Sequence, residues 1–161
     1  MNSDKAVPSP TAASPSTAAT PGSSDSAFGA AEPVSAASWW VRHPDLAPDS
    51  VRRAQVLFDQ KGEGDQSWPV VGTGKYDKVI VVITCNAATH YRVELGSAVD
   101  PDQIWTEGDS CGGPNINTYE SPAIDRSSPP VTVHVTAPAN TKYFVTLYGL
   151  TAAKPLPTTT P

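Results

Sequence analysis

KVIVVITC, residues 78–85, is the stretch that decides the fold class. Its apolar run, VIVVI at 79–83, has the length of a strand and is far shorter than the roughly 20 residues of a membrane-spanning helix. All five of its residues are Val or Ile, so both faces of a strand built from them are apolar. We therefore predict a central β-strand over 78–85.

Three further runs place an apolar side chain at every second position, which is the period of a half-buried strand. In the first of them Tyr91, Val93 and Leu95 share one face and Arg92 and Glu94 the other. The runs are YRVELG at 91–96, VTVHVT at 131–136 and KYFVTLY at 142–148.

Weaker strand patterns cover AQVLFDQ at 54–60, SWPVV at 67–71 and INTYESPAI at 116–124. The first also allows a helix, because Asp49 is a candidate N-cap and apolar residues follow at helical spacing. We favour a strand near 53–60, since the GEG that follows directly would pair it with the next run. The chain from 97 to 115 is predicted to be a long connection.

Turn-forming residues separate all of these runs at regular intervals, so the pattern predicts about seven short strands joined by turns. This pattern predicts an all-β fold, an antiparallel two-sheet sandwich of the jelly-roll or immunoglobulin-like kind, with a disordered N-terminal tail. The predicted domain covers residues 38–153. Residues 1–37 and 154–161 are predicted to be disordered tails.

Composition and charge exclude several classes of function. The chain of 161 residues carries a formal net charge of −5, and its Lys and Arg are scattered, with Arg52 and Arg53 as the only adjacent pair. A nucleic-acid partner is not predicted, because such proteins gather cations against the phosphates. Neither a membrane-spanning run nor a signal peptide is visible.

The segment 1–37 consists almost entirely of Ser, Thr, Ala, Pro and Gly. Such a segment has too few large apolar side chains to offset the entropy of ordering. Two interpretations remain open, a disordered tail without a role and a stalk that holds the folded head away from a surface. The composition favours the stalk.

Cys85 and Cys111 are the two cysteines of the chain, and we predict that they form a disulfide. The bridge would fasten the 97–115 connection to the end of the central strand and would stabilise the fold by about 3.5 kcal/mol. Two buried thiols are the first alternative. A zinc site with His90 and His134 is the second, although the short paired spacing of structural zinc ligands is missing.

The tail and the head together resemble small exported β-sandwich lipoproteins of Gram-positive bacteria. The tail is similar to the spacer that follows their lipidated cysteine, with Met1 in the place of that residue. The head resembles them over about 85–150, on TC at 84–85, YRVELG at 91–96, SCGG at 110–113 and FVTLYG at 144–149. This resemblance implies an extracytoplasmic, membrane-anchored or secreted protein, and very little about its chemistry.

GDSCGGP at 108–114 differs by one inserted cysteine from GDSGGP, the string around the nucleophile of trypsin-like proteases. Cys111 shifts both glycines by one position after Ser110, and His43 lacks the surroundings of a catalytic base. A domain of this size also cannot supply the two barrels of that family. We therefore interpret Ser110 as a loop hydroxyl and predict no catalytic residue.

Two further groups of residues could bind a ligand. Asp100, Asp102, Glu107 and Asp109 could ligate calcium, but they lack EF-hand spacing, and a solvated loop is favoured. Trp105 and Tyr119 lie in polar, turn-rich surroundings and are the best candidates for exposed aromatic rings. Exposed rings of this kind can stack on sugars, although most aromatic residues of a small domain are part of its core.

These patterns predict an extracytoplasmic, surface-tethered binding or assembly module without catalytic activity. Its partner would be a protein or a cell-wall component, met by its surface or an edge strand, and the membrane would be reached only through a lipid anchor. The alternative is a carbohydrate-binding module that uses Trp105 and Tyr119. No cofactor or metal is predicted.

Overall fold

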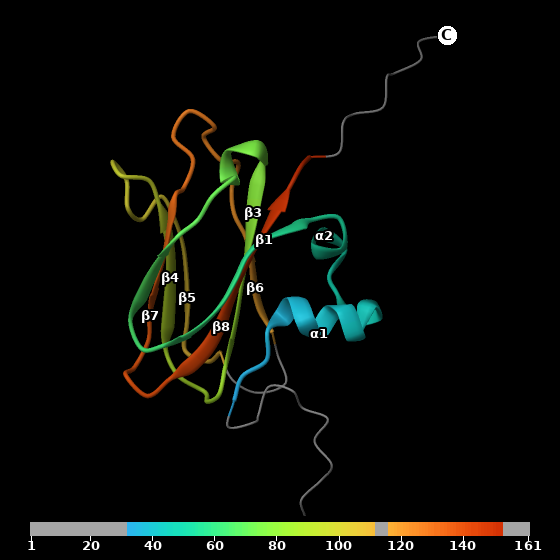
Figure 1. The fold of residues 1–161 in the computed structure, drawn as a ribbon, viewed down its shortest axis with the longest axis vertical. Coiled ribbons are helices and arrows are strands. Elements are labelled where there is room, and N and C mark those ends of the chain that lie inside the picture. Colours follow the sequence, from blue (N-terminus) through green and yellow to red (C-terminus); the bar gives the residue numbers. More distant parts are fainter. Residues whose placement is uncertain (1–31, 112–115, 153–161) are drawn as a thin grey trace, which may run out of the picture.

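The computed structural model describes residues 32–111 and 116–152, and within them it contains eight β-strands and four short helices (Figure 1). The strands are β1 (Gln55–Glu63), β2 (Gln66–Pro69), β3 (Lys78–Cys85), β4 (Tyr91–Gly96), β5 (Ile104–Gly108), β6 (Asn117–Glu120), β7 (Thr132–Thr136) and β8 (Lys142–Leu150). The helices are α1 (Ala36–Arg42), η1 (Pro44–Leu46), α2 (Asp49–Arg52) and η2 (Thr73–Lys75).

The strands form two antiparallel four-stranded sheets. Sheet A has the order β1-β8-β3-β6 and sheet B the order β2-β7-β4-β5. Among the described strands, only β4 and β5 pair with a neighbour in sequence; each of the other connections passes from one sheet to the other, as in a jelly roll. The predicted all-β sandwich is confirmed, and of its two forms the jelly roll is the one observed. KVIVVITC is β3, an inner strand of sheet A between β8 and β6.

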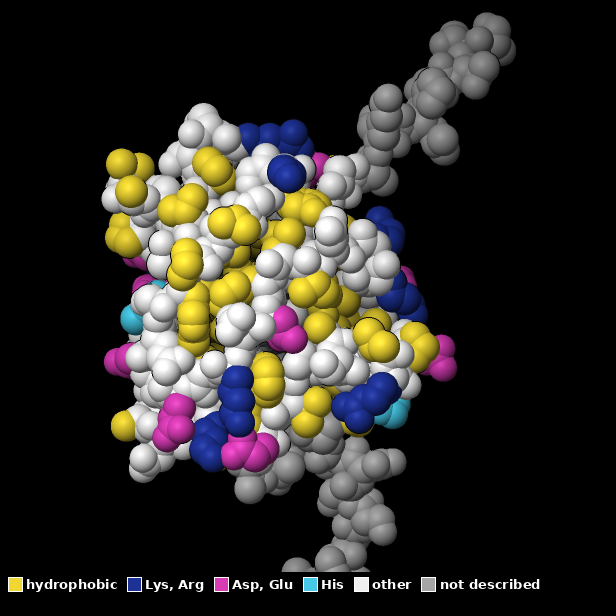
Figure 2. Space-filling model, viewed as in Figure 1, with side chains coloured by type: hydrophobic (Ala, Val, Ile, Leu, Met, Phe, Trp, Pro, Cys, Tyr) yellow, Lys and Arg dark blue, Asp and Glu magenta, His cyan; other side chains and the backbone are white. Residues whose placement is uncertain are grey.

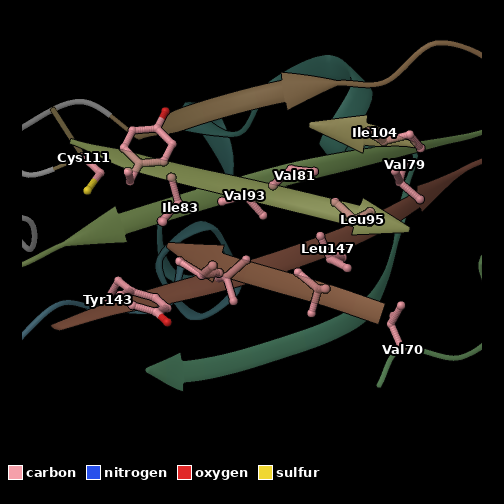
Figure 3. Close-up of a cluster of buried hydrophobic side chains, with 14 of the residues drawn as sticks. Val70, Val79, Val81, Ile83, Val93, Leu95, Ile104, Cys111, Tyr143 and Leu147 are labelled. Atoms are coloured by element: carbon pink, nitrogen blue, oxygen red, sulfur yellow. The ribbon is translucent and has the colours of Figure 1, made fainter. Parts of the chain in front are cut away.

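The main core fills the space between the two sheets (Figure 3). β3 contributes Val79, Val81 and Ile83, and β4 contributes Val93 and Leu95, all almost completely buried. The period of two explains this core, because every second side chain of each strand points to the same side. The alternation predicted for 91–96, 131–136 and 142–148 is therefore the alternation between this core and the outer faces.

A second core lies on the outer face of sheet A, where α1, η1 and α2 form a third layer (Figure 1). Ile80 and Val82 of β3 are buried there, and Trp40 of α1 packs on Tyr148 of β8 with ring centroids 5.9 Å apart. This layer explains why β3 is apolar on both faces. The predicted domain begins at residue 38, and sequence analysis did not predict the helix α1 that carries Trp40.

The interpretation of residues 48–64 is partly wrong. A helical turn and a strand follow each other: α2 ends at Arg52 and β1 begins at Gln55, with Pro48 rather than Asp49 as the N-cap. The hairpin expected at GEG does not form, because β1 pairs with β8 in sheet A and β2 pairs with β7 in sheet B. β8 has nine residues, as many as β1, and can pair with it along its length, whereas β2 has only four residues.

The long connection predicted over 97–115 is also wrong, because β5 lies inside it. β5 returns beside β4 after a tight turn in which the Ser97 N–H donates to the Asp100 carbonyl over 2.8 Å. Gly96 makes this turn possible, since a Cβ there would lie 2.1 Å from the Pro101 carbonyl oxygen. Sequence analysis missed this strand because IWTEG is only five residues long and lies among turn-forming residues.

The predicted disulfide between Cys85 and Cys111 is confirmed. Cys85 ends β3 of sheet A and Cys111 follows β5 of sheet B, so the bridge joins the two sheets, and both residues are buried. Because both cysteines are in the disulfide, the two alternatives of buried free thiols and of a zinc site are wrong. Most of the predicted N-terminal tail, the predicted C-terminal tail 154–161, and Gly112, Gly113 and Pro114 lie outside the described residues. Residues 32–37 lie against sheet A, and Ser35 caps α1.

Candidate functional site

Trp105 is an exposed aromatic residue on β5, at the free edge of sheet B. The strand alternates, so Ile104 points into the core while Trp105 and Glu107 point outward. Across the strand pair Trp105 faces Glu94 and Glu107 faces Arg92. Trp105 keeps 47% of its surface exposed, which is unusual for a side chain of this size.

Arg92 holds the Trp105 ring from one side. Its guanidinium carbon lies 4.6 Å from the ring centroid, within the range of a cation–π contact. Nε of Arg92 donates to Glu94 over 2.7 Å and a terminal N–H donates to Glu107 over 3.2 Å. These carboxylates, Glu94 first, raise the pKa of Arg92 above its ordinary value. The arrangement fixes the ring in place. Beside the ring, the two carboxylates of Glu94 and Glu107 share the single positive charge of Arg92.

Tyr119 lies on β6, the free edge strand of sheet A, opposite Val81 of β3. Its ring points inward, is partly buried and packs against the main core. Because β5 and β6 are edge strands on the same side of the sandwich, Tyr119 and Trp105 line one cleft of about 390 Å³, here called the Trp105 cleft. Its lining residues are Gln103, Ile104, Trp105, Thr106, Glu107, Tyr119 and Pro122.

Gln103 lines this cleft, but its amide group is directed into the protein. Its Nε2 donates to the Ser128 carbonyl over 3.0 Å, while its Oε1 is buried and has no donor among the described residues. A buried acceptor without a donor costs about 1–3 kcal/mol. The Trp105 cleft is thus lined by Trp105, Tyr119 and Glu107 among other residues, and its volume lies within the size range of small-ligand pockets.

A second, smaller pocket of about 80 Å³ adjoins the cleft and shares Thr106 and Tyr119 with it. We call it the Asn117 pocket; its lining residues are Val81, Ile83, Tyr91, Thr106, Asn117, Thr118 and Tyr119. The Asn117 amide donates to the Ser110 carbonyl over 2.6 Å, which fixes its orientation. Sequence analysis gave no role to Asn117 or Arg92, because only the strand register brings them to this edge.

The acidic residues of 100–109 do not assemble into a cation site. Within 32–111 and 116–152, no group of three or more His, Cys, Asp and Glu side chains is placed to hold a metal. Glu107 pairs with Arg92, and Asp109 lies 3.0 Å from His90 at the surface. The structure therefore separates the carboxylates that the sequence places within ten residues.

Ser110 and His43 lie in different parts of the fold. Ser110 follows β5 of sheet B, and its carbonyl accepts the hydrogen bond from Asn117. His43 stands at the end of α1 on the outer side of sheet A, with its ring 4.0 Å from the ring of Trp39. The two residues of the protease comparison do not form a pair.

A serine, a histidine and a glutamate do share one row on the outer face of sheet B, which sequence analysis missed. Ser67 pairs with His134, and His134 with Glu94. However, Nδ1 of His134 lies 2.6 Å from the Ser67 hydroxyl and Nε2 lies 3.2 Å from the Thr136 hydroxyl. Glu94 instead binds Arg92, and among the described residues the partners of the imidazole are these two hydroxyl groups rather than the carboxylate of a catalytic triad.

An apolar hollow of about 220 Å³ lies among the helices, where hydrophobic side chains reach the surface next to Arg and Lys in Figure 2. Val41 and Val56 line it and are exposed, and Trp40 and Tyr148 are buried beneath. It offers few groups that could orient a ligand by hydrogen bonds. The Trp105 cleft is the better candidate site for that reason.

Comparisons with known proteins do not identify a family for this chain, so its function has to be inferred from the site itself. No protein-family model, curated protein or solved structure matches the chain. In the part of the chain that the structure describes, no helix is long and apolar enough to cross a membrane. The fold and site define a jelly-roll β-sandwich with an aromatic cleft at its open edge.

Proposed function

We propose that the protein is a non-catalytic binding module, displayed outside the cytoplasm on a surface tether, and that the Trp105 cleft is its ligand site. One observation carries this proposal: Trp105 is exposed yet held by Arg92, in a cleft that it shares with Tyr119. A preorganised aromatic ring binds without a large loss of side-chain entropy. Its exposure in water has no benefit for the fold alone.

The displayed location rests on three features of the chain. The disulfide joins the two sheets, and stable disulfides are typical of oxidising compartments. The Ser-, Thr-, Ala- and Pro-rich segment before the domain has the composition of a spacer. The resemblance to exported lipoproteins of Gram-positive bacteria implies the same compartment. The partner in this setting is a cell-wall component or another exported protein.

Loss of the indole tests the site. Trp105→Ala is expected to weaken the binding of purified Gram-positive cell walls by about tenfold to a hundredfold, because aromatic anchors commonly contribute 1–3 kcal/mol. Sedimentation of the protein with the walls measures the binding. Leu46→Ala, which truncates an exposed side chain at the helices, is the matched control. Equal binding of wild type and Trp105→Ala would place the ligand site elsewhere.

A carbohydrate ligand is the second candidate function. It is favoured by the presence of Trp105, Tyr119 and the carboxylate of Glu107 in the lining of one cleft. Aromatic rings stack on the C–H faces of sugars while polar side chains bind the hydroxyl groups. A glycan-array screen separates this candidate from a protein partner. Retained glycan binding after Trp105→Ala and Tyr119→Ala together would exclude this cleft as the sugar site.

A further inference from the structure

The Asn117 pocket differs from the Trp105 cleft in size and chemistry. Its volume of about 80 Å³ equals the share of two or three water molecules in the liquid, so it is too small for a sugar ring and large enough for a small substituent. Val81 and Ile83 of β3 give it apolar walls. Asn117 and Thr106 bring an amide and a hydroxyl group. Thr118 borders the pocket, but its side chain points to the outer face of sheet A, on the same side as Val82.

An acetamido group matches this combination of apolar walls and polar side chains. Its methyl group is apolar and would lie against Val81 and Ile83, and its N–H and C=O need one acceptor and one donor, which amide and hydroxyl side chains provide. A bare hydroxyl group would leave the apolar walls without a contact. A carboxylate would enter a pocket without a described Lys or Arg in its lining.

The two cavities meet at Thr106 and Tyr119, so a ring in the larger cavity can send a substituent into the smaller one. We infer that the site binds an N-acetylated amino sugar, with the ring in the Trp105 cleft and the acetamido group in the Asn117 pocket. This inference rests on the proposed binding function of the cleft and names the class of ligand.

The charges beside Trp105 set a further condition. Arg92 is shared by Glu94 and Glu107, so this cluster carries two negative charges against one positive charge. The chain as a whole is also acidic, with a formal net charge of −5. An uncharged N-acetylated sugar chain meets no repulsion here, whereas a polyanionic polysaccharide does.

A pair of oligosaccharides that differ only in the substituent tests the inference. Chitotriose carries acetamido groups where cellotriose carries hydroxyl groups. We expect the wild-type protein to bind chitotriose at least about tenfold more tightly in calorimetry, which is the usual effect of one well-placed substituent. In saturation-transfer NMR, the acetyl methyl protons should receive the strongest saturation. Equal affinity for the two sugars, or no binding of either, would overturn the inference.

Two variants separate the pocket from the cleft. Asn117→Leu fills the pocket and removes the amide, so it should abolish the preference for chitotriose. Trp105→Ala should weaken both sugars alike and leave the preference. Intact disulfide mass and an unchanged thermal unfolding midpoint serve as folding controls, and Asn117→Ala, which removes the amide without adding bulk, repeats the test if Asn117→Leu unfolds. A preference that survives both pocket variants contradicts the assignment.

Failure of this inference can be told from failure of the proposed function. If neither sugar binds but cell-wall binding still depends on Trp105, the cleft remains a ligand site and its ligand is another component. If cell-wall binding does not depend on Trp105 and neither sugar binds, both the site and its ligand class are wrong.

Discussion

At the scale of single residues, the two aromatic side chains singled out in the sequence lie in one cleft, but their partners came from the fold. Trp105 and Tyr119 are separated by a sheet-to-sheet connection, and only the edge positions of β5 and β6 bring them together. Arg92 reads as an ordinary polar strand residue in YRVELG. Its contact with Trp105 follows from the β4–β5 register, which the sequence does not specify.

Tyr143 shows how one buried polar atom is accommodated. Its side chain has no exposed surface, and its hydroxyl donates to the Gly64 carbonyl over 2.9 Å. The ring lies so close to Gly62 that a Cβ there would be 2.6 Å from it. Burial, with a smaller contribution from Asp65, raises the pKa of Tyr143 above its ordinary value of 10.0. The phenol therefore keeps its proton in the folded state when the unfolded state has lost it.

This shift predicts a specific alkaline dependence. A raised pKa contributes stability that is complete below pH 10 and is lost as the pH rises through the folded-state pKa. We expect Tyr143→Phe to lower the free energy of unfolding by about 1–3 kcal/mol at pH 7, because the Gly64 carbonyl loses its donor. The gap between wild type and variant should narrow above pH 10. Urea titrations at pH 7, 10 and 11 measure it, and a constant gap would refute the assignment.

At the scale of elements, strong periodicity predicted β3, β4, β7 and β8, whereas β5 and α1 were missed and α2 was only an alternative to a strand. β5 has five residues among turn formers, and its strand conformation depends on pairing with β4. α1 has seven residues, which is too short to be stable without tertiary contacts. Both elements form because an apolar surface of the sandwich is available to them.

Trp40 tests whether the helical layer is part of the cooperative fold. It is almost fully buried between α1 and Tyr148, so Trp40→Ala should lower the free energy of unfolding by about 3–5 kcal/mol. Val41→Ala on the same helix is the matched control, since Val41 is 82% exposed and should change stability by less than about 0.5 kcal/mol. Urea denaturation followed by circular dichroism measures both. Similar small losses would show that α1 unfolds independently of the sandwich.

At the scale of the whole molecule, the disulfide adds a covalent cross-link between the two sheets to the backbone connections that already join them. It joins positions 26 residues apart, so its removal should release about 3.5 kcal/mol of loop-closure entropy in the unfolded chain. Replacing both cysteines by alanine should lower the free energy of unfolding by that amount. Chemical denaturation of the double variant and of wild type measures it, with reduced wild type as a control for the loss of the two thiol groups. A decrease in the free energy of unfolding of less than about 1 kcal/mol would show that the packing of the two sheets, and not the disulfide, provides the stability.

Local periodicity and an even pair of cysteines were sufficient to predict the fold class, the central strand and the disulfide. The folded molecule was needed to show which sheet each strand joins, that helices cover sheet A, and that Trp105, Tyr119, Arg92 and Asn117 meet at one edge. Strand order depends on contacts between residues far apart in the chain. Local side-chain preferences are the same for every order that buries the same faces.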